Sequence, residues 1–209
     1  MIIAIDGPAA AGKGTLAKKI AAHFGFEYLD TGSLYRGVGY KVVQRGGAPK
    51  NQADALAAAQ KLDVNDLSGD ELRTVQAGEN ASLVAQMPDV REEMLGFQRR
   101  FAKTAKAIKG GCVLDGRDIG TIVCPDAEIK LFVTASAQVR AQRRHDELLA
   151  RGETSDFDSL LATLIKRDKR DSERAIAPLV AAKDAHLLDT SKLDIETAFQ
   201  TAIDIINNA

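Results

Sequence analysis

Apolar residues follow two patterns along this chain. In five places they form short continuous runs, which are typical of strands buried in a parallel sheet. Between these runs they recur every three or four positions, which is the spacing of an amphipathic helix. Strands that alternate with helices predict an α/β fold, a five-stranded parallel sheet covered by helices on both faces in three layers. The predicted strands are residues 2–5, 27–29, 112–114, 128–134 and 186–188.

The helical stretches carry signals for their ends. The first begins at Lys13 and stops at Gly25, because glycine readily takes the left-handed conformation that ends a helix. Thr31 or Ser33 is expected to cap the second helix, and Pro88 suits the first position of a long one. The other predicted helices are residues 52–62, 70–85, 136–150, 156–174 and 194–207, with a polar link at 63–69.

Composition restricts the class of protein. A chain of 209 residues suits one α/β domain with room for a small inserted subdomain. Its net charge of −1 argues against a general nucleic-acid binder, and no apolar run is long enough to cross a bilayer. We therefore expect a cytoplasmic protein without a membrane or nucleic-acid partner. Cys112 and Cys124 lack metal-ligand spacing, so we expect reduced thiols and no protein-bound metal site.

The segment GPAAAGKGT directly follows the first strand and opens the first helix. Its glycines allow backbone N–H groups to converge on anionic oxygens, the helix N-terminus favours negative charge, and Lys13 can reach the outer phosphates. Gly14 stands where such loops usually carry a hydroxyl residue, and Thr15 comes one position late. The predicted ATP-phosphate contacts are Gly7, Pro8, Ala9, Ala10, Ala11, Gly12, Lys13, Gly14 and Thr15.

A rival interpretation treats the same segment as a dinucleotide site. Residues 12–17 also match G-x-G-x-x-A, and Asp30 follows at the end of the second strand. In that motif, however, the first glycine stands at the end of the strand, whereas Gly12 lies six residues beyond Asp6. An inert glycine-rich turn is the third reading. The phosphate loop is favoured because all three of its requirements occur together.

Four segments carry a family resemblance. The loop, with Gly-Thr after the lysine, resembles that of nucleoside monophosphate kinases. Three longer segments, YLDTGSLYR (28–36), LDGRDIGT (114–121) and RDKRDSERAIAPLVAAKDAHLLDTS (167–191), closely resemble bacterial cytidylate kinases, and the likeness runs through nearly the whole chain. It implies a P-loop NTPase-like fold and a monomeric kinase that transfers phosphate from ATP, bound with Mg²⁺, to CMP or dCMP.

The resemblance also assigns roles to charged residues. It implies that Arg36, Arg117 and Arg174 hold the acceptor phosphate, while Arg167 and Asp171 contact its sugar. Cytosine offers an amine that donates and ring atoms that accept, and the resemblance places base readers at Ser82, Arg91 and Asp118. Thr31 and Tyr35 complete the implied CMP contacts. The implied catalytic residues are Lys13, Asp115, Arg117 and Arg174, with Asp115 organising magnesium through water.

The residues alone leave some of these roles open. Arg167, Asp171 and Arg174 are spaced i, i+4, i+7, so they would share one helical stripe, which a solvated salt-bridged face would do equally. Asp115 would also serve as a simple cap. Arg143 and Arg144 are predicted to reach the donor phosphates from a closing lid, although an exposed helix–loop–helix would look similar.

The resemblance implies one kinase domain over residues 1–209 with three parts. These are a core (1–35, 106–142 and 172–209), an acceptor-binding subdomain (36–105) and a lid (143–171). The stretch at 62–71 is shorter than in many relatives and lacks strand patterning, so we expect a small, helical subdomain. Alternative functions are a UMP/CMP-type or shikimate-type kinase, a dinucleotide-dependent oxidoreductase, and a nucleotide-binding regulator without transfer.

Overall fold

The computed structural model describes residues 1–63, 67 and 69–208. By its internal contacts the chain divides into two compact units, residues 1–29 with 105–209 and residues 30–104. The larger unit carries the phosphate loop, and the smaller unit is helical.

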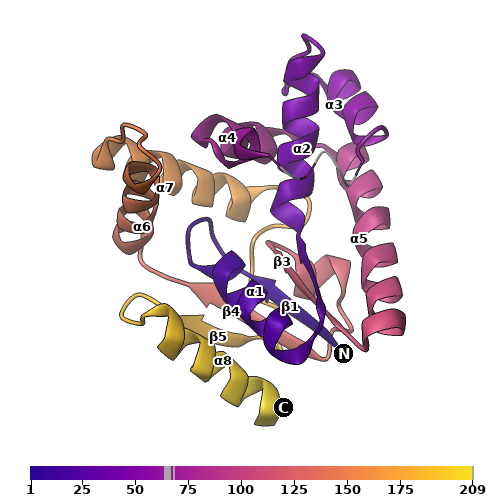
Figure 1. Cartoon of the computed structure of the whole chain (residues 1–209). Helices are drawn as coiled ribbons and strands as arrows, with labels where there is room; N and C mark the ends of the chain where they lie inside the picture. Colours follow the sequence, from indigo (N-terminus) through magenta and orange to yellow (C-terminus); the bar gives the residue numbers. More distant parts are fainter. Residues whose placement is uncertain (64–66, 68, 209) are drawn as a thin grey trace. The chain divides into compact units, whose positions relative to one another are not determined.

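The sheet of the larger unit has five parallel strands, as the apolar runs predict (Figure 1). The strands are β1 (Ile2–Asp6), β2 (Glu27–Asp30), β3 (Cys112–Gly116), β4 (Ile129–Thr134) and β5 (His186–Asp189), in the order β2-β3-β1-β4-β5. β1 is the central strand, and its last residue, Asp6, lies opposite Gly116 of β3 and Phe132 of β4. The loop that follows β1 therefore leaves the middle of the sheet at its carboxyl edge, where open α/β folds bind ligands.

One face of this sheet holds the hydrophobic core. Helices α1 (Lys13–Phe24) and α8 (Ile195–Asn208) pack against each other and against the strands on this face. The apolar positions that the helical spacing picks out in α1 are buried here, and Gly25 ends the helix with a φ of 67°. The fully or nearly fully buried members include Ile3, Ile5, Leu16, Ala17, Ile20, Val113, Leu131, Val133 and Ala202.

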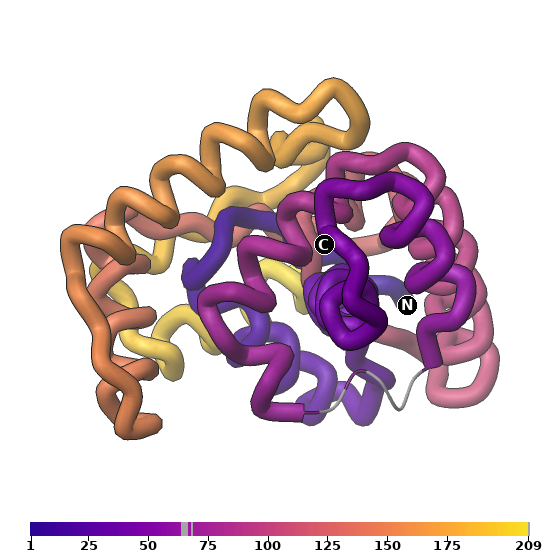
Figure 2. The backbone as a smooth tube through the Cα atoms, turned by 90° about the horizontal axis from the view of Figure 1, so that it is seen from above, coloured from indigo at the N-terminus to yellow at the C-terminus, as the bar shows by residue number. Residues whose placement is uncertain are grey.

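The opposite face is more polar. Asp6 and Lys130 project from β1 and β4, and both are buried. Over β1 and β3 lies η3 (Ile119–Val123), a single π-helical turn that the sequence patterns did not indicate. Farther along the chain, α6 (Ala137–Ala150) and α7 (Phe157–Glu173) run side by side as a helical hairpin, drawn in orange in Figure 2.

The smaller unit is built from helices. These are α2 (Thr31–Gln44), α3 (Gln52–Ala59), the 3₁₀ turn η2 (Asp70–Arg73), α4 (Val75–Val84) and most of α5 (Pro88–Lys109). α2 packs against both α3 and α4. At Gly39 the two backbones of α2 and α4 come close, because a Cβ there would lie 2.9 Å from the Cβ of Asn80.

Three expectations about helix ends were wrong. Asp30, not Thr31 or Ser33, caps α2, since its carboxylate accepts the Ser33 N–H at 3.2 Å. The predicted helix at 70–85 is two elements, because Thr74 is extended and caps α4. α7 ends at Glu173, so Arg174 leaves the helical stripe of Arg167 and Asp171 with an extended backbone.

Two further expectations concern features outside the helices. The predicted link at 63–69 lies partly outside the described residues. Cys112 and Cys124 are both buried and neither is in a disulfide, which agrees with the expected reduced thiols. Within the described ranges no helix is long and apolar enough to cross a membrane.

Candidate active site

The phosphate loop turns between β1 and α1 through residues that adopt positive φ. Gly7 has a φ of 146°, and a Cβ there would lie 1.9 Å from the carbonyl oxygen of Val133. Ala10 and Gly12 also have positive φ, at 60° and 87°. Gly12 caps α1 without a side-chain hydrogen bond, so the first N–H groups of the helix are left for another acceptor. A loop of this shape at a helix N-terminus suits an anion.

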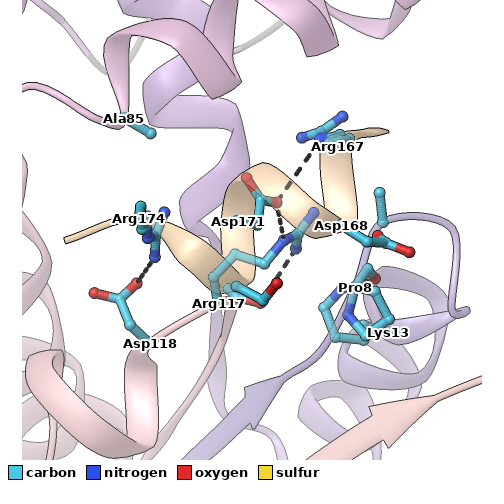
Figure 3. Close-up of polar contacts among 12 residues, drawn as sticks. Pro8, Lys13, Ala85, Arg117, Asp118, Arg167, Asp168, Asp171 and Arg174 are labelled. Carbon is cyan, nitrogen blue, oxygen red and sulfur yellow. Dashed lines mark hydrogen bonds and ion pairs between the residues drawn. The ribbon is translucent and has the colours of Figure 1, made fainter. Parts of the chain in front are cut away.

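Lys13 lies inside this loop and is 5% exposed. Its ammonium group donates a 2.9 Å hydrogen bond to the carbonyl oxygen of Pro8, which lies beside it in Figure 3. The same group lies 3.8 Å from a carboxylate oxygen of Asp115. Asp115 reaches this point because it occupies β3 opposite Ile5 of β1. Lys13 is therefore held in place by the neutral carbonyl oxygen of Pro8 and by the carboxylate of Asp115.

Gly14, which follows the lysine, packs close to Asp115. A Cβ at Gly14 would lie 3.3 Å from Oδ2 of Asp115 and 3.7 Å from the hydroxyl of Tyr28. A serine or threonine at this position would crowd the carboxylate. Thr15, one residue later, is exposed.

Three arginines gather around Asp171. Its carboxylate is 5% exposed and accepts a 3.2 Å hydrogen bond from Nε of Arg117, and Nε of Arg167 lies 3.9 Å away. Burial acts to raise the pKa of Asp171, but the positive charges of Arg117, Arg167 and Arg174 outweigh it and hold that pKa below its usual value. The carboxylate is thus ionised and fixes two guanidinium groups, which leaves this cluster with an excess of positive charge.

Arg174 is connected to a second carboxylate. Its terminal nitrogen lies 3.6 Å from Oδ1 of Asp118 (Figure 3). Its Nε donates to the carbonyl of Ala177. Both side chains of the ion pair are buried, with exposed fractions of 6% and 8%. Asp118 stands directly before η3, and Arg174 directly after α7. The structure therefore brings together four of the residues that the family resemblance singles out: Arg117, Asp118, Asp171 and Arg174.

The helical hairpin is tied to the phosphate loop by Arg140. This buried side chain of α6 donates to the carbonyl oxygens of Ala135 and Ala9, at 2.9 and 3.1 Å, and forms a bidentate ion pair with Asp168 of α7. The sequence reasoning missed Arg140. The available signal was its place in the predicted helix 136–150, where it shares a face with the apolar Leu148.

The two arginines predicted to reach donor phosphates differ in their surroundings. Arg143 donates to the hydroxyl and carbonyl oxygens of Thr190, at 3.0 and 2.7 Å, and its guanidinium lies 3.8 Å from where a Cβ of Gly12 would be. Arg143 is therefore beside the loop. Arg144 instead forms a 2.7 Å ion pair with Glu147 on its own helix.

The predicted acceptor contacts of the smaller unit lie on three of its helices. Arg36 of α2 is ion-paired with Asp30. The guanidinium of Arg91 on α5 lies 5.9 Å from the ring centre of Tyr35 and donates a 3.4 Å hydrogen bond to the carbonyl of Ala85. Thr31 of α2 and Ser82 of α4 are both buried.

Comparison with known proteins identifies the family. The family model described as cytidylate kinase matches residues 3–208. A cytidylate kinase from Xanthobacter autotrophicus is 55% identical over 206 residues, which cover 99% of this chain and 97% of the relative. One from Paramagnetospirillum magneticum is 54% identical over 207 residues, covering 99% and 98%. The chain belongs to the cytidylate kinase family.

Solved structures support the fold of this cytidylate kinase family member. A shikimate kinase from Bacteroides thetaiotaomicron superposes with a TM-score of 0.54 at 13% identity, covering 99% of this chain and 98% of that one. An uncharacterised protein from Eubacterium ventriosum gives 0.58 at 18% identity, covering 100% and 99%. The predicted P-loop α/β fold is confirmed, and the family assignment leaves the dinucleotide reading of residues 12–17 without support.

Sequence reasoning about the cytidylate kinase site passed over Asp6. This residue ends β1, and its carboxylate is 4% exposed. It accepts the N–H groups of Ile119 and Gly120, both at 2.8 Å. Burial raises the pKa of Asp6 to about 6, against the lowering effect of these two hydrogen bonds. The sequence signal was a carboxylate at the end of an otherwise apolar strand.

Proposed function

We propose that this cytidylate kinase family member transfers the γ-phosphoryl group of ATP to CMP or dCMP. The bond between the γ-phosphorus and the bridging oxygen of ATP breaks, and a phosphate oxygen of the acceptor forms the new bond, which yields ADP and CDP or dCDP. The observation that carries the proposal is that the larger unit contains both a phosphate loop with its buried lysine and a cluster of arginines. The family names of its relatives indicate the acceptor.

The two groups of residues have separate tasks. The loop residues 7–15 and Lys13 would hold the ATP phosphates, with Arg143 as a further donor beside the loop. Arg117 and Arg174 would hold the acceptor phosphate, because a guanidinium offers two parallel hydrogen bonds to phosphate oxygens. Phosphoryl transfer needs little covalent chemistry from the protein, so positioning and positive charge account for most of the catalysis.

The surroundings of Lys13 support this division. Asp115 touches Lys13 and stands two residues before Arg117 on the same strand end. Arg140 ties the loop carbonyl of Ala9 to α7, which carries Asp171. The donor-phosphate loop and the arginine cluster are therefore braced against each other within one compact unit. Such bracing would keep the reacting groups in line.

Magnesium is part of the proposal. The described residues contain no group of three or more side chains suited to ligate a metal. Gly14 removes the usual hydroxyl ligand, and Asp115 is the carboxylate beside Lys13. These residues fit a Mg²⁺ ion that is held by ATP phosphates and water, with Asp115 accepting from that water. Held in this way beside Lys13 and Asp115, the ion would supply positive charge next to the ATP phosphates.

The acceptor contacts include residues of both units. Asp171 and Arg167 would contact the acceptor sugar, and Asp118 the cytosine amine. Further acceptor contacts are proposed at Thr31, Tyr35, Arg36, Ser82 and Arg91, with Arg144 assigned to ATP. We retain the division into core, acceptor subdomain (36–105) and lid (143–171). We also propose a monomer in the cytoplasm; two buried cysteines outside any disulfide fit a reducing compartment.

A coupled assay of ADP release tests the function. The enzyme is offered ATP with CMP, dCMP, UMP, AMP or shikimate in parallel. We expect the highest kcat/KM with CMP or dCMP. Faster turnover of UMP, AMP or shikimate would refute the assigned acceptor. ATP binding without ADP release for any acceptor would instead indicate a nucleotide-binding regulator.

A further inference from the structure

The start of η3 is capped in an unusual way. The first N–H groups of a helical turn have no partner within it, and the residue at the N-cap commonly satisfies them with its own side chain. Asp118 holds that position, and aspartate is among the preferred capping residues. Its side chain nevertheless makes no capping hydrogen bond. It forms the buried ion pair with Arg174.

Asp6 supplies the missing cap from a different strand. Its two carboxylate oxygens accept the N–H groups of Ile119 and Gly120, one each, at 2.8 Å. Asp6 lies more than a hundred positions before these two residues in the sequence and meets them because β1 and β3 are neighbours. Asp6 therefore does for η3 what Asp118 would otherwise do.

The contact between Asp6 and the start of η3 is closely surrounded by other atoms. A Cβ at Gly120 would lie 3.4 Å from Oδ2 of Asp6 and 3.1 Å from Cδ of Lys130. Lys130 is itself held by a bidentate pair with Asp184, at 3.0 and 2.7 Å. The carbonyl of Asp118 accepts from Ile122 at 2.9 Å and closes the turn. Asp6 holds the backbone N–H groups of Ile119 and Gly120, and the backbone of Asp118, which directly precedes them, is thereby held in place as well.

We propose that Asp6 is a positioning residue for nucleobase selectivity. By capping η3 in place of Asp118, it directs the Asp118 carboxylate toward Arg174 and the acceptor base. The inference rests on the proposed function, because it takes Asp118 as the group that accepts from the cytosine amine. Asp6 itself does not touch the substrate, and its effect is transmitted through the backbone of residues 118–120.

The test compares Asp6→Asn with a matched control, Glu128→Gln. Glu128 is also a carboxylate that accepts a backbone N–H of the sheet, that of Ile2 at 2.7 Å, but at the other end of β1. Asparagine at position 6 offers one acceptor and places an NH₂ group against the second N–H. We expect kcat/KM for CMP to fall about tenfold or more, as for other small displacements of binding groups. The CMP:UMP ratio should fall toward one, with KM for ATP changed less than KM for CMP.

Amide hydrogen exchange reports the cap without using activity. Peptides that cover residues 117–124 should exchange faster in Asp6→Asn and at the wild-type rate in Glu128→Gln. A wild-type CMP:UMP ratio in Asp6→Asn would overturn the proposal, whatever the exchange shows. If the wild type does not phosphorylate CMP, the proposed function fails, whereas unchanged exchange in Asp6→Asn refutes the capping argument alone.

A second variant covers the case in which Asp6→Asn does not fold. Gly120→Ala keeps β1 intact and pushes a methyl group against the Asp6 carboxylate and the Lys130 stem. We expect the same loss of CMP:UMP selectivity. Selectivity equal to that of the wild type in a folded Gly120→Ala would show that the start of η3 does not control the base reader.

Discussion

The cluster around Asp171 yields a prediction whose magnitude follows from its geometry. Asp171→Asn removes a charge and leaves the shape nearly unchanged. The Arg117 Nε lies 3.2 Å from the carboxylate, and Coulomb's law with an effective dielectric constant of about 20 gives roughly 5 kcal/mol of gross attraction. Loss of one partner from a buried ion pair costs about 3–5 kcal/mol. Because asparagine keeps an oxygen that can accept from Arg117, we expect a fall of about 3 kcal/mol in the free energy of unfolding.

The same variant should separate the two substrates. If Asp171 contacts the acceptor sugar and orders Arg117, KM for CMP should rise about tenfold, which corresponds to about 1.4 kcal/mol, while KM for ATP changes less than about twofold. The assays are urea unfolding and steady-state ADP release with each substrate varied in turn. Asp158→Asn, an exposed position in the first turn of the same helix, is the control; it should leave both KM values unchanged and lower the free energy of unfolding by no more than about 1 kcal/mol. Equal increases in KM for ATP and CMP would refute acceptor recognition and leave Asp171 with a purely structural role.

Three further variants test other parts of the site. Lys13→Met should lower kcat about 100-fold or more, because it removes a positioned cation from the transferring phosphate, and near-normal turnover would disprove the loop assignment. In the wild type, the Asp118 carboxylate would face a uracil carbonyl without a proton between them, so we expect CMP to be preferred over UMP by about tenfold or more. Asp118→Asn supplies an amide that can donate to this carbonyl, so kcat/KM for UMP should rise relative to that for CMP. An unchanged CMP:UMP ratio would leave Ser82 and Arg91 as the base readers. The Asp6 pKa of about 6 lies above the 3.8 of an ordinary aspartate, so folding favours the protonated form and stability from this group declines as pH rises from 3.8 to 6. Relative to Asp6→Asn, the wild type should lose about 3 kcal/mol across that interval in urea unfolding, and a pH-independent difference would contradict the shift.

The fold could be predicted where the signals are local. The apolar runs and the glycines at 7, 12 and 25 depend on a few neighbouring residues, so the strands, the loop and α1 were predicted to within one or two residues. The cap of α2 was not, because Asp30, Thr31 and Ser33 are all good capping residues and the choice depends on where β2 ends. Arg174 was predicted to share the helical stripe because the spacing of residues along the sequence does not reveal the turn at Ala177, whose φ is 50°.

The site shows the same division between local and distant signals. Lys13 and the arginines stand in recognisable segments, so they were named as candidates. Arg140 and Asp6 were missed because their partners are far away in sequence. Arg140 binds a carbonyl 131 positions earlier, and Asp6 binds an N–H 113 positions later. Such pairings depend on the order of strands in the sheet, which hydrophobic patterns do not encode.

The contact between Gly14 and Asp115 limits how this loop can be engineered. A Cβ at Gly14 would approach the Asp115 carboxylate to 3.3 Å, and that carboxylate also meets Lys13. A G-K-S loop from another nucleotide-binding protein would therefore place a Cβ against a side chain a hundred residues downstream, which would have to shift by a few tenths of an ångström. The loop and Asp115 are therefore coupled, and a loop exchange should be designed together with the residue at position 115.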